Sequence, residues 1–314
     1  MAGLSQKISR EVEIIPRDVS FEVATKQVPR YWFNDDPWST HWMNALFSVV
    51  PVGERFICHT FADQLKKIKD PSIHKATLGL IRQERLHARE HAVMNETLSG
   101  FGVPLEDAEA ILGKVLDVFK KYMSDETKLG FAAISEHFTA SLSEVMFDNL
   151  ELWDETELEI AAMMYWHFVE ETEHKSVAFD VLMDRRSDDS DLGTYALRMA
   201  TAGLSMGLFL PLIHGIWLYF VWKDGQLTNV RSAFKSFKSL MFGAAVVPKM
   251  FLTKTLPYIK PSFHPWDIDN RAHVAAWKTV YEETGDPLLA FTALREWHAK
   301  HGSYKPTIKQ AATV

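Results

Sequence analysis

The pattern Glu-x-x-His occurs twice in this chain, at residues 84–87 and 171–174, and each copy lies on the apolar face of a predicted helix. Residues three apart in a helix share one face, so each copy places a carboxylate beside an imidazole. Two more glutamates, Glu54 and Glu136, each lie on the apolar face of another predicted helix. Ionised carboxylates are rarely buried without a partner. If these four helix faces meet in one core, the carboxylates repel one another strongly unless cations neutralise them.

The periodicity of the apolar residues predicts an all-α protein built on a four-helix bundle. The bundle helices are expected over residues 53–68, 71–98, 125–149 and 155–183, with a connecting helix over 105–122. Three regions are expected: an extended N-terminal arm over 1–37, the bundle over 38–190, and an apolar helix with basic C-terminal helices, packed on the bundle, over 191–314. The arm is predicted to be extended because Val and Ile alternate with charges at 12–15 and prolines follow.

The carboxylates and imidazoles together indicate a metal site. One Glu from each of two helices, plus Glu-x-x-His from each of two others, is the ligand set of a bundle that holds two iron or manganese ions. Two divalent cations balance four carboxylates and leave the imidazoles neutral. No thiolate belongs to the set, which favours iron, with manganese as the alternative, over zinc or copper. The expected ligands are Glu54, Glu84, His87, Glu136, Glu171 and His174. A polar core network without metal, or wrongly assigned helix faces, are the alternatives.

Further polar residues lie next to these candidates. His167 lies on the same helix face as Glu171 and is either an added ligand to one metal ion or a core histidine bonded to a carboxylate. His91, one turn after His87, is expected to contact a ligand rather than a metal ion. Cys58 is expected to fill the core. Four residues flank candidate ligands but point away from them, and are expected at the surface or behind the ligands: Glu90, His137, Glu170 and Glu173.

The order Glu, Glu-x-x-His, Glu, Glu-x-x-His resembles the ferritin-like di-iron carboxylate proteins. The pattern His-x-x-x-Glu-x-x-His over 167–174 resembles the di-iron arylamine N-oxygenases, which carry an extra histidine there. The runs RYWFNDDPW (30–38), VGERF (52–56) and QERLH (83–87) resemble the bacterial family described as predicted metal-dependent hydrolases, over most of 28–260. These resemblances imply a ferritin-like bundle with the same six ligands, and only the N-oxygenases imply His167 as a seventh. An apolar segment after the bundle departs from the N-oxygenases, so their substrate is not inferred.

Bundles of this type usually use O2 to oxidise a C–H or N–H bond, although two metal ions can also activate water for hydrolysis. The two His-bearing helices, the absence of a Ser-His-Asp set or a Gly-rich phosphate loop, and small residues beside Glu136 favour oxidation of an apolar or amphipathic small molecule. Such an oxygenase would need a reductase or ferredoxin, because no flavin or nicotinamide fingerprint is present. Two alternatives stay open: a di-metal hydrolase of an ester or phosphoester, and a non-catalytic metal-binding protein at the membrane.

Residues 199–222 contain no Asp, Glu, Lys or Arg. As a helix this segment would be about 36 Å long, against roughly 30 Å for a bilayer core. It is interpreted as a buried core helix, a membrane-embedded or monotopic contact, or a spanning helix. Residues 223–314 carry 13 Lys and Arg against 7 Asp and Glu, which suggests an anionic membrane surface as a partner.

The cellular location is predicted from the cysteine count and the N-terminus. A single cysteine fits a reducing compartment, and the first 30 residues lack the features of a secretory signal. We therefore expect a cytoplasmic protein, and a peripheral or monotopic position on the inner face of the membrane stays open as an alternative. The formal net charge of -7 argues against nucleic acid as a partner.

Overall fold

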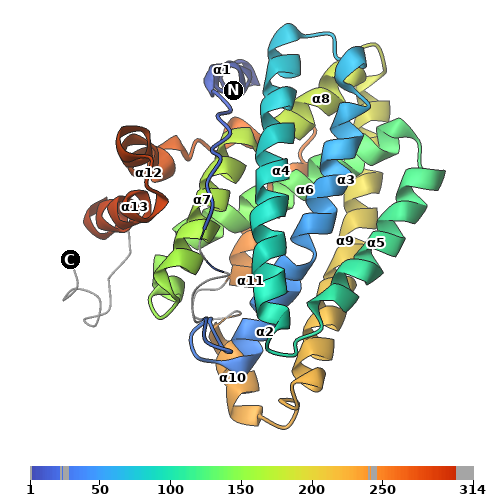
Figure 1. The fold of residues 1–314 in the computed structure, drawn as a ribbon. Helices are drawn as coiled ribbons and strands as arrows, with labels where there is room; N and C mark the ends of the chain where they lie inside the picture. Colours follow the sequence, from blue (N-terminus) through green and yellow to red (C-terminus); the bar gives the residue numbers. More distant parts are fainter. Residues whose placement is uncertain (1, 22, 24–27, 240, 242–245, 302–314) are drawn as a thin grey trace.

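A computed structural model describes residues 2–21, 23, 28–239, 241 and 246–301, and every regular element in these residues is helical. The all-α prediction is confirmed (Figure 1). The longer helices are α1 (Ala2–Glu11), α2 (Pro37–Ser48), α3 (Val50–Ala62), α4 (Pro71–Ser99), α5 (Leu105–Tyr122), α6 (Asp125–Phe147), α7 (Leu158–His174), α8 (Val177–Arg185), α9 (Asp191–Lys223), α10 (Val230–Lys238), α12 (Arg271–Thr284) and α13 (Pro287–His301). The short helical turns are η2 (Leu65–Lys67), η3 (Leu150–Trp153), α11 (Val246–Lys249), η5 (Met250–Thr255), η6 (Leu256–Ile259) and η7 (Pro265–Asp267).

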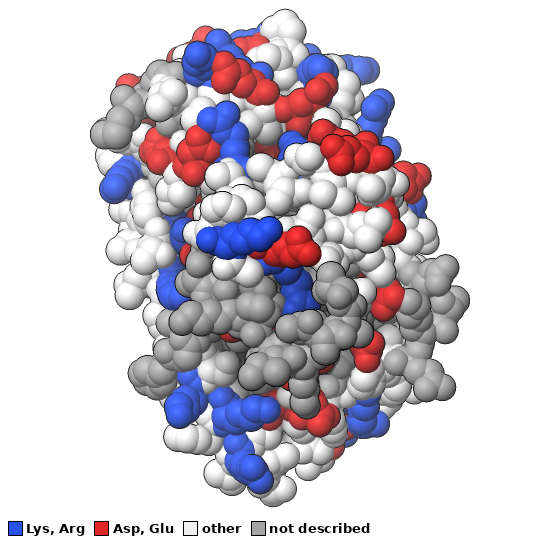
Figure 2. All heavy atoms as spheres, turned by 90° about the vertical axis from the view of Figure 1, so that its left-hand side faces the viewer, with Lys and Arg blue, Asp and Glu red and all other residues white. Residues whose placement is uncertain are grey.

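Helices α3, α4, α6 and α7 form the central bundle, and the other helices surround it. Helix α5 contacts α2, α3 and α4, while α9 packs against α6 and α2. Helices α12 and α13 pair with each other and contact α7 on the left-hand side of Figure 1. That side of the molecule carries Lys and Arg side chains interspersed with Asp and Glu (Figure 2). The division of the chain into three regions stays a prediction.

Local capping explains why two bundle helices begin where the sequence predicted. The Asp70 side chain accepts a hydrogen bond from the Ser72 backbone N–H, with Pro71 at the first helical position of α4. The Ser124 hydroxyl accepts from the Thr127 N–H at the start of α6. Helix α5 begins and ends at the predicted residues, and its basic last turn suits the helix dipole.

The fourth predicted bundle helix is broken in the structure. Helix α7 ends at His174 and α8 begins at Val177, whereas the sequence predicted one helix over 155–183. The buried Lys175 ammonium donates to the Ile268 carbonyl at 2.7 Å and to the Asn270 side chain at 2.8 Å. These contacts come from the segment that precedes α12. Because they are distant in the sequence, helical periodicity alone cannot reveal this break.

Two other boundaries differ from the predictions. The first bundle helix spans α3, Val50–Ala62, and not residues 53–68. Residues 2–11 form helix α1 within the arm that was predicted to be extended throughout. The first proline of the arm is Pro16, so nothing before residue 12 forbids a helix. Residues 12–21 of the arm are not helical.

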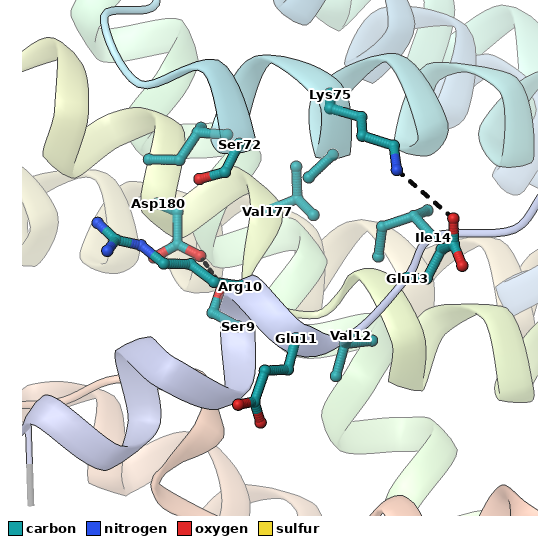
Figure 3. A pocket seen from close by; sticks show the side chains of 12 residues that line it. Ser9, Arg10, Glu11, Val12, Glu13, Ile14, Ser72, Lys75, Val177 and Asp180 are labelled. Atoms are coloured by element: carbon teal, nitrogen blue, oxygen red, sulfur yellow. Dashed lines mark hydrogen bonds and ion pairs between the residues drawn. The ribbon is translucent and has the colours of Figure 1, made fainter.

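The N-terminal segment runs along the bundle beside α4 and α7 (Figure 1). The Ser9 hydroxyl contacts Ser176 at 2.8 Å and donates to Asp180, beside a cavity of about 300 Å³ (Figure 3). Further along, Ile14 packs so closely on α4 that a Cβ at Gly79 would lie 2.8 Å from the Ile14 Cβ. Only glycine fits at this position of α4 without displacing the arm. The arm is therefore fitted to the surface of the bundle.

Candidate metal centre

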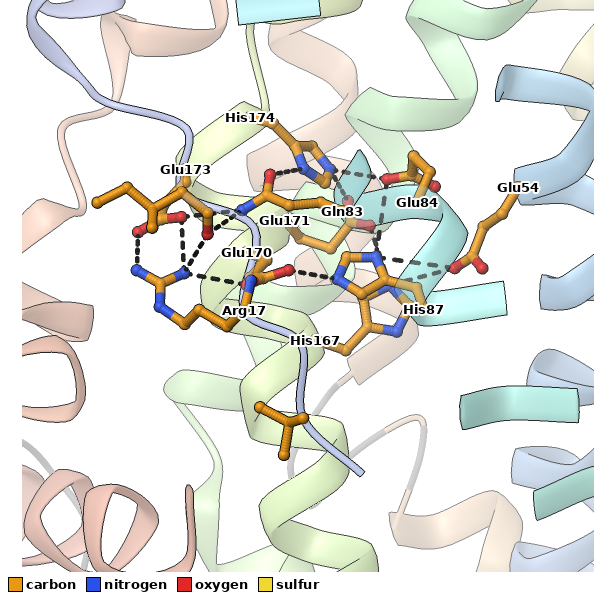
Figure 4. A network of polar contacts seen from close by, with 12 residues as sticks. Arg17, Glu54, Gln83, Glu84, His87, His167, Glu170, Glu171, Glu173 and His174 are labelled. Atoms are coloured by element: carbon orange, nitrogen blue, oxygen red, sulfur yellow. Dashed lines mark hydrogen bonds and ion pairs between the residues drawn. The ribbon is translucent and has the colours of Figure 1, made fainter. Parts of the chain in front are cut away.

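All seven candidate ligands lie together inside the bundle, and Figure 4 labels all of them except Glu136. Helix α3 supplies one residue, α4 two, α6 one and α7 three. Each side chain is buried, with at most 7% of the residue exposed. The residues are Glu54, Glu84, His87, Glu136, His167, Glu171 and His174. The structure thus brings together every residue that the sequence predicted for the centre, and their binding of metal stays a prediction.

The seven residues form two neighbouring groups, and within each group the candidate ligand atoms lie within 4.8 Å of one another. One group holds Glu54, His87 and His167. The other holds Glu84, Glu136, Glu171 and His174. Two adjacent clusters of oxygen and nitrogen donors offer places for two cations.

Two carboxylates lie between the groups. Glu84 Oε1 is 3.7 Å from His87 Nδ1 in one group and 3.2 Å from His174 Nε2 in the other. Glu171 places Oε1 at 3.0 Å from His167 Nε2 and Oε2 at 3.3 Å from His174 Nε2. Both glutamates are therefore placed to share a cation with each group. The other two carboxylates, Glu54 and Glu136, each belong to one group only.

The centre contains buried polar atoms that make no hydrogen bond to any described residue. Such atoms are costly to bury, since each loses its bonds to water without replacement. They are Glu54 Oε2, Glu84 Oε1, His87 Nδ1, Glu136 Oε2 and His174 Nε2. All five belong to candidate ligands, and the only close contacts between them are ion pairs, such as that of His174 Nε2 with Glu84 Oε1 and Glu136 Oε2 at 3.2 Å each. Metal coordination would satisfy them together, so this donor set fits two divalent cations.

The pKa values of the glutamates also show that negative charge is unfavourable in this buried centre. Burial and then the other carboxylates raise the pKa of Glu54 well above its usual value. Burial also raises the pKa of Glu84 to about 7 and that of Glu136 to about 8. Burial opposes the charge on Glu171, but His174 and His167 outweigh it and lower its pKa well below the usual value. In the absence of cations the centre therefore holds protons at neutral pH.

Each imidazole has one ring nitrogen that faces other candidate ligands, and the opposite ring nitrogen is held by a further contact. His87 Nε2 is 3.0 Å from Glu170 Oε2, and His174 Nδ1 is 2.9 Å from the Gln83 side-chain oxygen. His167 Nδ1 is 2.8 Å from His91 Nε2. Such contacts set the ring orientation and the tautomer of a metal-binding histidine. The prediction that His91 contacts a ligand agrees with this geometry.

The Arg17 side chain, from the N-terminal arm, holds the layer behind the ligands. Its guanidinium pairs with Glu170 at 3.0 Å and with Glu173 at 2.7 Å, and all three side chains are buried. It also lies over the Trp277 ring at 5.4 Å, which links the arm to α12. Lys278 pairs with Glu173 at 2.7 Å. The arm and α12 thus stabilise the acidic residues that orient the ligands.

The four residues that were expected at the surface or behind the ligands are all buried. Glu170 contacts a ligand directly, and Glu173 contacts Arg17 and Gln83. Glu90 accepts from the Phe21 backbone N–H at 3.0 Å and so anchors the arm. His137 points elsewhere: its ring donates to the Lys254 carbonyl and stacks on Tyr258. Surface positions for these residues are therefore excluded.

An apolar cavity of about 270 Å³ adjoins the centre. Five predicted ligands line one part of it, and Leu210 and His214 of α9, both exposed at the surface, line another. Between them the walls are mainly apolar side chains such as Phe131 and Ile57. The Thr139 hydroxyl, also in the lining, donates to Glu171 Oε2 at 2.6 Å. The cavity therefore connects the centre with the outer face of α9.

Sequence reasoning missed three residues of this site. Thr139 lies three residues after Glu136 and so shares its helix face, a signal that was available. Gln83 directly precedes Glu84, but its orientation toward His174 could not be read from periodicity. Arg17 is 153 residues from Glu170 in the chain, and nothing in its local sequence indicates the pairing.

Cys58 fills the core as expected, and its thiol donates to the Ile81 carbonyl at 3.6 Å. Burial and nearby glutamates raise the pKa of this thiol, which disfavours the thiolate that a metal ligand requires. The centre is thus built from oxygen and nitrogen donors alone.

Comparisons with known proteins agree with a metal site. A family model described as "Predicted metal-dependent hydrolase" matches residues 15–269. The match begins in the arm that carries Arg17 and extends beyond α9 and α10. Searches of curated proteins and of solved structures gave no significant match.

Proposed function

This chain belongs to the family of predicted metal-dependent hydrolases, and from this premise we propose that it is a di-metal enzyme that uses O2 to oxidise an apolar or amphipathic small molecule. Iron is the proposed metal, with manganese as the alternative. The observation that supports the proposal is the cluster of buried carboxylate and imidazole atoms that make no hydrogen bond to a described residue, beside an apolar cavity.

The donor set supports two ions of this type. Carboxylate and imidazole ligands without thiolate suit iron and manganese. Glu54, His87 and His167 would hold one ion, while Glu136 and His174 would hold the other. Glu84 and Glu171 lie between the groups and would contact both. Two such ions, once reduced, supply electrons to O2, and an external reductase or ferredoxin would have to restore them.

The protein's own residues would prepare the site for this reaction. Glu170, Gln83 and His91 hold the three imidazoles in position, so the ligand geometry exists before any metal binds. The Thr139 hydroxyl donates to Glu171 and limits its rotation. The apolar walls of the cavity exclude water from the reacting atoms and favour an apolar substrate.

Hydrolysis is the second candidate, because the family description names it. Two metal ions can lower the pKa of a water molecule and orient it toward an ester or phosphoester. The apolar lining favours the ester of a long apolar acid over a phosphoester, whose charge would be poorly solvated there. The same ligands would serve either reaction, so the two candidates differ in the source of the oxygen atom.

Isotope labelling separates the candidates. Protein loaded with ferrous iron would be supplied with a reductant and with either a dodecyl alcohol or a dodecanoate ester, and products would be analysed by mass spectrometry. Under ¹⁸O2 the proposed oxidation gives a labelled product from the alcohol, and removal of O2 stops it. Hydrolysis instead gives labelled acid from the ester in H2¹⁸O without O2. A product labelled only from water would overturn the oxidation proposal. Background rates of both reactions would favour a non-catalytic metal-binding protein.

A further inference from the structure

Helix α9 is arranged with its apolar side outward. By length and composition it is the one helix among the described residues that could cross a membrane, yet only 22% of its most apolar window is buried. Over its first half the buried residues are polar: Thr194, Arg198, Thr201 and Ser205. The outer face instead exposes Leu204, Leu210, Leu218 and Trp222. A wholly buried core helix, one interpretation of the sequence, is therefore excluded for α9.

The polar inner face of α9 packs closely on the bundle. A Cβ added at Gly130 of α6 would lie 2.9 Å from the Thr201 side chain. The Thr201 hydroxyl donates to the Leu197 carbonyl of its own helix at 2.8 Å, so it needs no partner in α6. Small hydroxyl residues thus permit close contact inside, and the bulky apolar residues are left outside. This first half of α9 is the reverse of a helix that faces water, whereas the second half buries apolar residues such as Ile213, Ile216 and Phe220.

Helix α10 has the same reversed arrangement. Its buried residues are Ser232 and Ser236, and the Ser232 hydroxyl donates to Asp36 at 2.8 Å. Phe234 and Phe237 point outward, with 67% and 52% of each residue exposed. Trp38 joins the two helices, because its ring meets Trp217 of α9 edge-on at 5.5 Å and its backbone N–H donates to Ser232. Through Trp38, helix α2 therefore links α9 with the buried side of α10.

The charge of this region complements an anionic surface. Between Asp224 and Asp267 the chain has six Lys and Arg residues and no Asp or Glu. Arg231, Lys235 and Lys238 lie exposed on α10, next to its outward phenylalanines. Exposed aromatic side chains with basic residues at their edge are the composition of a helix that lies in the headgroup region of a bilayer. A water-facing surface would not expose so many bulky apolar residues together.

The opening of the cavity lies on this same surface. Leu210 and His214, which line the cavity, are exposed on the outer face of α9. Met250, at the start of η5, lines it from the neighbouring segment, which exposes Leu252, Leu256 and Ile259. A bilayer against this surface would meet the opening directly, and an alkyl chain could pass into the cavity without crossing water.

We propose that α9, α10 and residues 252–259 form a docking surface for an anionic lipid bilayer, and that the cavity takes its substrate by the alkyl chain from that bilayer. The docking part is independent of the proposed function, whereas the substrate part rests on it. Together they narrow the substrate class to molecules with a long alkyl chain that reside in the membrane.

Flotation with lipid vesicles tests the docking part. Full-length protein would be mixed with vesicles of phosphatidylcholine containing 30% phosphatidylglycerol, and with vesicles of phosphatidylcholine alone. The protein is expected to float with the anionic vesicles and to bind the neutral ones more weakly. Replacing Phe234 and Phe237 by Ser should lower the partition coefficient at least tenfold, and Lys235→Gln should lower it about fivefold. Metal-free protein should bind equally, so a failed metal site would not affect this result.

The matched control is Val118→Ser on α5, which removes an apolar side chain of similar exposure, 53%. It should leave the partition coefficient within a factor of two, and circular dichroism would check that each variant is folded. Absence of binding to anionic vesicles would overturn the proposal. So would a stable dimer that is broken by the Phe234 and Phe237 changes, because a second copy would then be what covers this surface.

A fluorescent label tests whether α9 itself meets the lipid. Cys58 is buried and is the one cysteine of the chain, so an introduced cysteine can be labelled selectively. An environment-sensitive dye at Leu218→Cys should shift to shorter wavelength when anionic vesicles are added, whereas the same dye at Val118→Cys should not. Equal shifts, or none at Leu218→Cys, would contradict the proposed orientation.

The cavity offers a variant for the substrate part. Gly53 lines it, and a Cβ added there would meet no atom within 4 Å. Gly53→Leu should therefore narrow the cavity, and circular dichroism would check that the variant is folded. Binding of a fluorescent dodecanoic acid probe should fall at least tenfold, while flotation and metal content stay unchanged. Undiminished probe binding by this variant, or no binding by the original protein, would overturn the substrate part alone.

Discussion

Helices α7 and α9 both turn polar side chains toward the interior, but they do so with different chemistry. Helix α7 buries His167, Glu171 and His174, which carry or accept charge and converge with residues of three other helices. Over its first half, helix α9 buries Thr201, whose hydroxyl bonds to the backbone of the same helix, and Arg198, whose guanidinium donates to the Tyr258 carbonyl. A hydroxyl can be satisfied locally, whereas a buried carboxylate needs a counter-charge. The buried polar side chains of α7 therefore indicate a bound ligand. Those of α9 indicate that its apolar side chains form the outer surface.

The largest effect is expected where buried charges would lose their partner. Arg17→Ala leaves Glu170 and Glu173 with one fewer cation in a buried site, and should destabilise the protein by about 3–5 kcal/mol. Urea unfolding measures this change. Arg10→Ala removes a cation of the same arm whose side chain is 66% exposed, and should cost under about 1 kcal/mol. Equal effects of the two changes would show that the Arg17 pairs contribute no more than a surface contact.

The second-largest effect is expected when a candidate metal ligand loses its charge. Glu136→Gln removes a charge but keeps the shape, and should weaken metal binding about a hundredfold or more, which is roughly 2.7 kcal/mol. Because burial raises the pKa of Glu136 to about 8, glutamine resembles the state that it adopts without metal. The metal-free variant should thus be as stable as the original protein, or more so. Competition with a chelator gives the affinity, and loss of stability without loss of metal would indicate a purely structural role.

The stability of the metal-free protein should fall as pH rises from 6.5 to 8. The raised pKa values of Glu84, about 7, and Glu136, about 8, mean that the folded state binds more protons than the unfolded chain in this window. The pKa of His174 is also raised, since Glu171, Glu136 and Glu84 outweigh the effect of burial, and it acts in the same direction. Thermal unfolding with and without bound metal measures the trend, which metal should remove. A metal-free protein that becomes more stable over this range would contradict the assignment.

The smallest effect is expected on the inner face of α9. The Ser205 hydroxyl is buried and makes no hydrogen bond to a described residue, so Ser205→Ala should change stability by less than about 1 kcal/mol, in the stabilising direction. Urea unfolding measures the change, and metal content should not respond. A destabilisation as large as that of Arg17→Ala would mean that polar groups inside α9 serve a bound partner, as those of α7 do.

Helical periodicity and the spacing of Glu and His were enough to predict the bundle and the meeting of all seven candidate ligands. Each candidate lies on the apolar face of a helix, so local sequence determines which way it points. The break after His174 and the position of Arg17 depend on contacts with α12 and the arm that are distant in sequence. Periodicity contains no information about such contacts. The exposure of α9 could not be read either, because an apolar helix looks alike in sequence whether protein or lipid surrounds it.

The central claim is that seven side chains from four helices form one centre for two metal ions. The most direct test is to remove metal with a chelator, add ferrous iron without O2, and count bound ions per chain by mass spectrometry, using native protein and the Glu136→Gln and His174→Ala variants. We predict two ions per chain for the native protein and about one for each variant, because Glu136 and His174 belong to the same group, with the fold of all three proteins intact by circular dichroism. A folded native protein that binds no metal, or a His174→Ala variant that keeps both ions, would contradict the claim.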